Sequence, residues 1–327
     1  MEMTPKENRL AFYRHQKIDY MPLGKEAEIG PRPHQGWYDH PYLDQTGEDW
    51  FGCKWEYVPV AGAAAPDLAA GPLLKDICDW EDVVKFPDLD AFDWKHSAEM
   101  DGVDAWDREN NMVRCTSYVG LWERLHVLMG FEEALVSLLE EPEACEAFFD
   151  AMVDYKIKFI ERMNEYYHPD LLTFHDDYGT QKGPFFSPDI WREMLKPRTK
   201  KIIDYAHDLG LIFELHSCGK YDEIIPEISE IGVDSLQCMD INDLTAALEK
   251  TGDTMAYHPS VHEQDMAALD DAGLLDEQKV RDLVGPEFRK WGATGYYAPF
   301  IFPKGHWYDE VVWDEFSKVR EELRGTY

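Results

Sequence analysis

Residues 211–240 hold the side chains best suited to bind a soft metal ion. A short apolar run ends at His216-Ser217-Cys218-Gly219, and a second apolar run, about twenty residues later, ends at Cys238. Isoleucines recur at helical spacing between the two runs, so the pattern predicts strand, helix, strand. His216 and Cys218 are two residues apart and point the same way in an extended segment. Two thiols and one imidazole at neighbouring strand ends predict a zinc site with these three residues as ligands and an open position for substrate.

The same pattern has a second interpretation, which spacing alone does not separate from the first. A His-x-Cys pair is a weak signal. Cys218 and Cys238 also fit ordinary buried thiols, and His216 also fits a hydrogen-bonded residue of the core. Zinc binding is therefore an expectation that depends on how the strand ends meet.

A second group of titratable residues follows the apolar run at residues 170–174, which predicts a buried strand. His175, Asp176 and Asp177 come directly after this run. Adjacent residues alternate faces, so only part of the group points toward one site. We expect His175, with Asp176 or Asp177, to bind the substrate or to act as acid or base. Helix capping and loop hydrogen bonding are the alternative roles.

Three further residues are predicted to contact the substrate. Tyr178 follows the second group, and His258 ends a strand predicted at residues 254–257. Glu214 alternates with His216 and therefore shares its face. A carboxylate in an apolar strand needs a partner, so we expect Glu214 to meet a metal, a histidine or the substrate. A lone histidine such as His258 is more often structural than functional.

Strand and helix patterns alternate from about residue 111 to the end of the chain. With a short strand near residues 20–23, about seven strands alternate with helices. This alternation predicts an α/β fold with a parallel sheet, and the number of strands predicts closure into a (β/α)8 TIM barrel. An open, doubly wound sheet is the alternative. Both folds place their chemistry at the carboxyl ends of the strands, where the residues above lie.

The N-terminal region differs from the rest of the chain. Residues 25–110 read as irregular and are rich in Pro, Gly, Trp and Tyr. A segment of this length without regular structure is unusual unless it carries function. We interpret residues 1–327 as one barrel domain, in which residues 25–110 form an aromatic-rich lid over the barrel mouth.

Composition narrows the classes of partner. The 327 residues include 32 Lys and Arg against 65 Asp and Glu, which gives a formal net charge of −33. Such a charge repels nucleic acids and anionic membranes. The sequence has neither a secretory signal pattern nor an apolar run long enough to span a membrane, which predicts a cytoplasmic protein with reduced thiols. The absence of a G-x-G-x-x-G after the first strand and of a P-loop argues against dinucleotide and NTP binding by those motifs.

Five blocks of sequence carry a resemblance to a known family. They are PKENR at residues 5–9 with DYMP at 19–22, DWFGCKW at 49–55, DDYGTQ at 176–181, SPD at 187–189 with KPR at 196–198, and HSCG at 216–219. With them, the chain resembles the uroporphyrinogen decarboxylase superfamily nearly end to end. Within this superfamily it is similar to the corrinoid-dependent methyltransferase branch, which includes methyltransferases of the O-demethylase type.

The resemblance implies a (β/α)8 barrel and a zinc site of the form H-x-C plus a later Cys. His216 and Cys218 match the first pair. The later Cys of the family lies near the last strand, where residues 298–302 read APFIF, so Cys238 is the nearest replacement. The Gly-rich motif with Arg that holds substrate carboxylates in the decarboxylases does not match at residues 24–32.

The function implied by this resemblance is methyl transfer. The expected reaction moves a methyl group from a small donor, best a methoxylated aromatic compound, to the Co(I) of a corrinoid. The sequence shows no D-x-H-x-x-G motif for holding a corrinoid itself, so the corrinoid is expected on a separate protein that docks over the lid. The alternatives are transfer from a methyl-corrinoid to a thiol or tetrahydrofolate, a metal-free decarboxylase, and a ligand-binding protein without catalysis.

Overall fold

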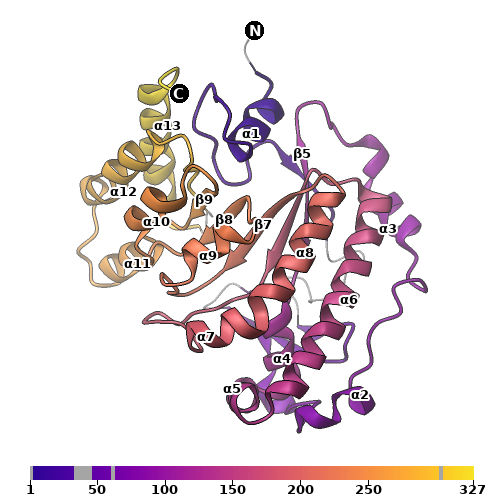
Figure 1. Cartoon of the computed structure of the whole chain (residues 1–327). Coiled ribbons are helices and arrows are strands. Elements are labelled where there is room, and N and C mark those ends of the chain that lie inside the picture. The colour runs from indigo at the N-terminus through magenta and orange to yellow at the C-terminus, as the bar shows by residue number, and fades with distance from the viewer. Residues whose placement is uncertain (1–2, 33–45, 60–62, 302–304) are drawn as a thin grey trace. The chain divides into compact units, whose positions relative to one another are not determined.

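The computed structural model describes residues 3–32, 46–59, 63–301 and 305–327 (Figure 1). The chain is mixed α/β, with a main sheet of six strands in the order β1-β5-β6-β7-β8-β9. These strands are β1 (Glu28–Ile29), β5 (Met112–Ser117), β6 (Leu171–His175), β7 (Ile212–Ser217), β8 (Ser235–Cys238) and β9 (Ala256–Pro259). The pairs β5 with β6, β7 with β8 and β8 with β9 are parallel. The sequence therefore predicted the class of sheet and the positions of its five later strands.

Helices alternate with the strands from β5 onward, as predicted. They are α4 (Leu121–Met129), α5 (Phe131–Glu140), α6 (Pro142–Tyr167), α7 (Pro188–Ile190), α8 (Lys196–Asp208), α9 (Ile225–Glu230), α10 (Leu244–Thr251), α11 (Glu263–Asp271), α12 (Glu277–Gly292) and α13 (Asp309–Leu323). Three helices, α1 (Pro5–Tyr13), α2 (Trp80–Val83) and α3 (Trp94–Asp101), precede β5. No described helix is both long and apolar enough to cross a membrane.

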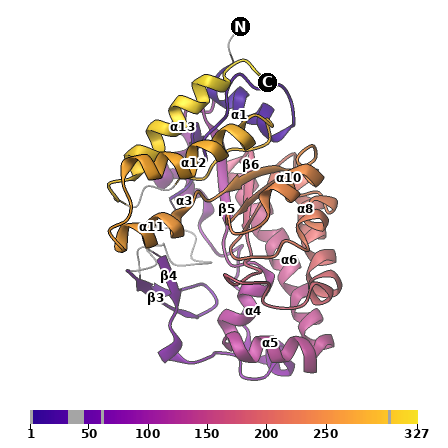
Figure 2. The ribbon, with the colours of Figure 1, turned by 90° about the vertical axis from the view of Figure 1, so that its left-hand side faces the viewer.

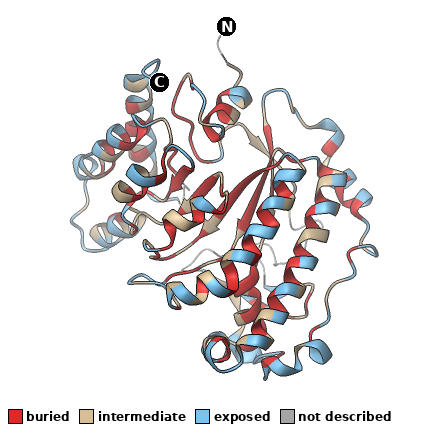
Figure 3. Cartoon of the chain, viewed as in Figure 1, coloured by how far each residue is buried: buried red, intermediate tan, exposed pale blue. Residues whose placement is uncertain are grey.

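Burial follows from the pattern of each element. The first four residues of β6, Leu-Leu-Thr-Phe, are all buried, as a near-continuous apolar run predicts for a parallel strand covered on both faces. Helix α6 shows the helical period instead, and its buried residues include Phe148, Met152 and Phe159. Figure 3 shows buried strands in the main sheet, and α6 and α8 each with a buried and an exposed face. Helix α7 is capped by Ser187, whose side chain accepts from the N–H of Ile190.

Contact density divides the chain into two compact units. Unit 1 comprises Met1–Glu28, Asp107–Met112 and Glu214–Tyr327, and unit 2 comprises Ile29–Trp106 and Val113–Phe213. Within unit 1, α12 and α13 run side by side (Figure 2), and within unit 2, α6 packs on α8. Strand β7 begins in unit 2 and continues in unit 1. The single barrel domain over residues 1–327 stays a prediction.

The extended segment after α12 continues the sheet of unit 1 without forming a regular strand. Tyr257 and Tyr297 form one parallel bridge, and Phe300 donates its N–H to the carbonyl of Pro259. On the far side of this segment, Gly24 donates its N–H to the carbonyl of Pro299. Pro299 itself has no N–H to donate, which interrupts a ladder. Residues 297–301 and the strand predicted near residues 20–23 are therefore without regular strand pairing, and closure by eight strands is not established among the described residues.

The lid region contains more regular structure than its composition predicts. Its described residues form a second sheet of three antiparallel strands, β2 (Gly47–Glu48), β3 (Lys54–Val58) and β4 (Ala63–Pro66) (Figure 2). Residues 33–45 and 60–62 of the predicted lid lie outside the described residues. Asp49, just before β3, joins this region to α4 through a buried ion pair with Arg124. A role for this region as a lid stays a prediction.

Candidate functional site

His175, the last residue of β6, is held by a carboxylate from α4. Its Nδ1 lies 2.9 Å from Oε2 of Glu123. Burial alone would lower the pKa of His175, but the charges of Glu123 and Asp177 outweigh it, and the pKa rises to about 9. The imidazole is therefore cationic at pH 7 in the free protein, with Nδ1 fixed by Glu123.

Asp176 caps α4. Its carboxylate is fully buried and accepts the N–H groups of Leu121, Trp122 and Glu123 at 3.2, 3.3 and 3.0 Å. These are the donors that a helix leaves unsatisfied in its first turn. Burial and the charge of Glu123 raise the pKa of Asp176 to about 8, while the backbone N–H groups act in the opposite direction. Asp176 thus occupies the capping role that the sequence left open, and Asp177 is the carboxylate near His175.

Tyr178 lies in the interior of unit 2. Its side chain is fully buried and packs edge-on against Trp191 and Phe186. Burial, followed by the charge of Asp176, raises the pKa of its hydroxyl. Contact with a substrate therefore stays a prediction for Tyr178, and its observed neighbours are core side chains.

The register of β7 with β8 sorts the predicted zinc ligands. His216 pairs with Gln237, and its Nδ1 donates to the amide oxygen of Gln237. Ser217 pairs with Cys238, so Cys238 shares the face of Ser217, opposite to that of His216. Cys218 stays with His216, since its Sγ lies 3.4 Å from Nε2 of His216. The structure therefore brings Cys218, but not Cys238, to His216.

Cys238 is a buried thiol on the other face of the sheet from His216. The side chain is buried, and burial together with the charges of Asp240 and Asp222 raises the pKa of its thiol. Zinc takes the thiolate, so binding at Cys238 would have to displace the thiol proton. Three ligands on His216, Cys218 and Cys238 are thus a prediction that the register does not favour.

Glu214 and His258 meet inside unit 1. Oε2 of Glu214 lies 3.6 Å from Nε2 of His258 and accepts from the hydroxyl of Ser235 at 3.0 Å. Both side chains are about 1% exposed. The His258 ring also packs on Phe12 and Tyr13 of α1. The expected histidine partner of Glu214 is present, and substrate contact by either residue stays a prediction.

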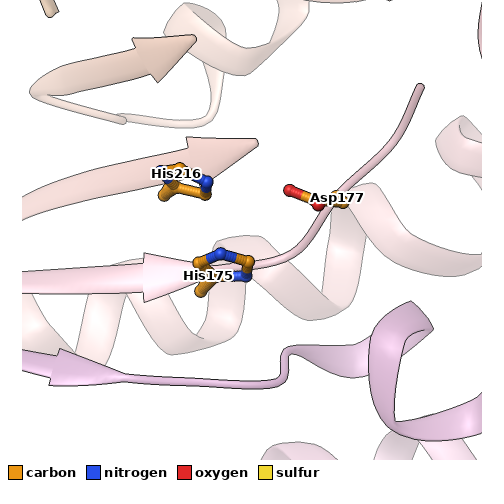
Figure 4. Close-up of side chains that lie close together, drawn as sticks. All are labelled: His175, Asp177 and His216. Atoms are coloured by element: carbon orange, nitrogen blue, oxygen red, sulfur yellow. The ribbon is translucent and has the colours of Figure 1, made fainter. Parts of the chain in front are cut away.

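His175, Asp177 and His216 form a cluster of metal-ligand type. One ligand atom from each residue lies within 4.8 Å of the others. In Figure 4 the two imidazole rings lie at the ends of β6 and β7, and the Asp177 carboxylate points back toward them. The Nδ1 of His175 is hydrogen-bonded to Glu123, and the Nδ1 of His216 is hydrogen-bonded to Gln237. Such outer partners orient metal-binding histidines and leave Nε2 for the ion.

The donor set fits a divalent metal. Two imidazoles and one carboxylate are the protein ligands of many catalytic zinc sites, and also suit other first-row metals. This set shares only His216 with the ligands predicted from the sequence. His175 and Asp177 were predicted as catalytic residues, without a role as metal ligands.

Two residues of α4 near this cluster escaped the sequence analysis. Glu123 occupies the first turn of the helix, where acidic residues are common for electrostatic reasons alone. His126 follows one turn later, and burial lowers its pKa to about 4 against the opposing charge of Asp177, so its imidazole is neutral at pH 7. The available signal was that α4 begins directly after a strand end, where parallel folds place polar residues.

Comparison with known proteins identifies the family of this chain. A family model described as uroporphyrinogen decarboxylase (URO-D) matches residues 66–258. A solved structure of a methyltransferase from Methanosarcina mazei is similar over 98% of this chain and 99% of its own, with 16% identity and a TM-score of 0.69. Old Yellow Enzyme from Pichia sp. AKU4542 covers 70% of this chain and 66% of its own, with 10% identity and a TM-score of only 0.39. None of the curated proteins matches the chain. At 16% identity, the first structure shows the fold alone.

Proposed function

This chain belongs to the uroporphyrinogen decarboxylase (URO-D) family, and from that premise we propose that it is a methyltransferase. The reaction moves a methyl group from a small methylated donor to the Co(I) of a corrinoid on a separate protein. The observation that carries this proposal is the cluster of His175, Asp177 and His216 at the carboxyl ends of β6 and β7. The similar fold of a methyltransferase supports the same class of reaction.

The three residues of the cluster would hold one divalent metal ion. When bound, the ion would polarise the donor oxygen, so that the oxygen can leave as an anion. Glu123 and Gln237 keep the two imidazoles in place by holding their Nδ1 atoms. Cys218, at 3.4 Å from Nε2 of His216, is the next group able to reach the ion. The pKa of about 9 for His175 implies that metal binding displaces a proton from this imidazole.

The chemistry requires a strong external nucleophile. In the step, the bond from oxygen to the methyl carbon breaks with its electron pair going to oxygen, and the carbon binds cobalt through the electron pair of Co(I). An ether oxygen is a poor leaving group, and no described side chain of this protein matches Co(I) as a nucleophile. The net charge of −33 favours a corrinoid protein with a basic docking surface.

Two further expectations belong to this proposal. We infer that the sheet closes as the eight-stranded barrel of the family, through the segments that carry Pro299 and Gly24, because backbone hydrogen bonds already continue there beyond β9. We also infer a cytoplasmic location, which the six free cysteines and the lack of disulfides among the described residues support.

Metal content decides between the two ligand sets. Wild-type protein and the variants His216→Ala, Asp177→Asn, Asp176→Asn and Cys238→Ser should be purified identically and measured by elemental analysis. His216→Ala and Asp177→Asn should each lose at least about 90% of the metal, as loss of a ligand requires. Asp176→Asn should retain it, and so should Cys238→Ser. Loss of metal in His216→Ala and Cys238→Ser, but not in Asp177→Asn, would restore the ligand set predicted from the sequence.

Methyl transfer is tested with cob(I)alamin and 2-methoxyphenol under anaerobic conditions. The wild type should convert the spectrum of Co(I) to that of methyl-Co(III) and release catechol. Asp177→Asn should lower the rate by about 10² or more, and Asp176→Asn by much less. Demethylation without any cobalt, or decarboxylation of a porphyrinogen by the protein alone, would contradict the proposal.

A further inference from the structure

Unit 2 contains a cavity of about 310 Å³ on the side of α4 that carries His126. It lies between the end of β4 with the turn after it and the junction of α4 with α5. Its described lining is Ala65, Pro66, Asp67, Leu68, Gly71, Pro72, His126, Val127, Gly130 and Phe131. This volume is at the lower end of the range for small-molecule sites and is large enough for a single aromatic ring with substituents.

The wall of this cavity is largely apolar and partly aromatic. Phe131 is edge-on to Phe185, with ring centres 4.9 Å apart, and to Trp122 at 5.7 Å. Leu68 and Phe131 are 87% and 41% exposed, so this part of the wall is open to solvent. The polar side chains of the lining are His126 and Asp67, and this lining includes no Lys or Arg.

Helix α4 connects the cavity to the reaction site. Glu123, which holds Nδ1 of His175, and His126, which lines the cavity, are three residues apart on this helix. Residues at this spacing lie on the same face, with their Cβ atoms about 5–6 Å apart. The charge of Asp177 acts to raise the pKa of His126, against the larger effect of burial. A molecule in the cavity that contacts His126 therefore has one end about a helical turn from Glu123, the carboxylate that contacts His175.

We propose that this cavity binds the ring of the methyl donor, and that the donor is an uncharged, single-ring aromatic ether. This inference rests on the proposed function. The ring would lie against Phe131 and Val127, and the neutral imidazole of His126 would hydrogen bond a ring substituent beside the ether. A carboxylate on the ring is disfavoured because Asp67 lines the cavity and this lining has no Lys or Arg. The formal net charge of −33 for the whole chain acts in the same direction.

Two variants of one strand test the site by direct binding. Ala65 lines the cavity, while Ala64 is its neighbour in β4 and points to the opposite face. Both are half-buried, so Ala65→Phe and Ala64→Phe are matched in size and place. Binding of 2-methoxyphenol and of 3-methoxybenzoate should be measured by equilibrium dialysis, without corrinoid. Melting temperatures would verify that both variants fold as the wild type does.

The wild type should bind 2-methoxyphenol at least about tenfold more tightly than 3-methoxybenzoate. Ala65→Phe should weaken the binding of 2-methoxyphenol by about tenfold or more, because the new phenyl ring fills the cavity. Ala64→Phe should change the affinity for 2-methoxyphenol by less than about twofold. If both variants weaken binding equally, or if Ala65→Phe does not weaken it, the cavity is not the binding site of the donor. Equal or tighter binding of 3-methoxybenzoate would overturn the ligand class.

The dialysis result and the methyl-transfer result can fail separately. Binding that Ala65→Phe abolishes, in a protein that does not methylate cobalt, would keep the cavity as a site and remove the proposed function. If Ala65→Phe transfers the methyl group of 2-methoxyphenol at the wild-type rate and KM, the proposed function stands. The donor then binds outside this cavity.

Discussion

Replacing Arg124 by Met should destabilise the protein by about 3–5 kcal/mol, which is the usual cost of breaking a buried ion pair from one side. Nη1 of Arg124 lies 2.6 Å from Oδ2 of Asp49, and both side chains are 0% exposed. The pair joins the first helix of the reaction site to the region before β3. A single substitution at Arg124 therefore tests this buried contact.

The magnitude follows from the contacts of both partners. Loss of a hydrogen bond between two charged groups costs about 1.5–3 kcal/mol. Loss of the guanidinium, 4.1 Å from the ring centre of Phe51, adds about 0.5–2 kcal/mol. The stranded carboxylate keeps three donors, the N–H groups of Phe51 and Cys53 and the indole of Trp55. These donors keep the expected cost within the range for a partly satisfied buried charge.

The assay is equilibrium unfolding in urea, followed by circular dichroism. Arg162→Met is the control, because its pair with Asp90 is 29% and 53% exposed and should contribute at most about 1 kcal/mol. In the double variant Arg124→Met with Asp49→Asn, part of the loss should be recovered, since no buried charge remains unpaired. The reasoning is refuted if Arg124→Met and Arg162→Met lower the free energy of unfolding by the same amount. It is also refuted if the double variant loses more stability than the two single variants lose together.

The other predictions concern pH and close packing. His262, 19% exposed, has its pKa raised to about 9, chiefly by its hydrogen bond to Glu287. Because the folded pKa is above the unfolded value, this contribution, at most about 3 kcal/mol, is complete below about pH 6.5 and is lost as the pH rises through 9. The urea midpoint of His262→Gln should therefore lie below that of the wild type at about pH 6, and this deficit should shrink by about pH 10. A Cβ at Gly120 would lie 2.4 Å from Cβ of Asp176, so Gly120→Ala should lower stability in urea by about 1–3 kcal/mol or more, whereas Gly183→Ala, with nothing within 4 Å, should change it by less than about 0.5 kcal/mol.

The sequence could predict the five later strands of the main sheet because a short apolar run marks each of them. It could also predict that His175 and His216 lie at strand ends, because position along a parallel strand fixes the edge that a residue reaches. The irregular composition of residues 25–110 concealed β3 and β4, whose small and aromatic residues give a weak alternation.

The sequence pattern could not predict which residue of each strand-end group has which role. Asp176 and Asp177 are adjacent and of one type, and only the position of α4 decides which of them caps a helix. Cys238 reads as a ligand until β8 is paired with β7, because a shift of one residue in register moves a side chain to the other face. Glu123 comes from a separate element, and nothing local to its sequence distinguishes it from an ordinary residue of a first helical turn.

The cap of α4 has a consequence for how the protein is made. Asp176 lies 55 residues after Leu121, whose N–H it accepts. Chains are synthesised from the N-terminus, so α4 leaves the ribosome several seconds before its cap exists. Until β6 has paired with β5, the first turn of α4 keeps its N–H groups in water, and Glu123 has no imidazole to hold. A nascent chain that stalls before residue 176 therefore carries an uncapped helix, and the reaction site cannot begin to assemble on it.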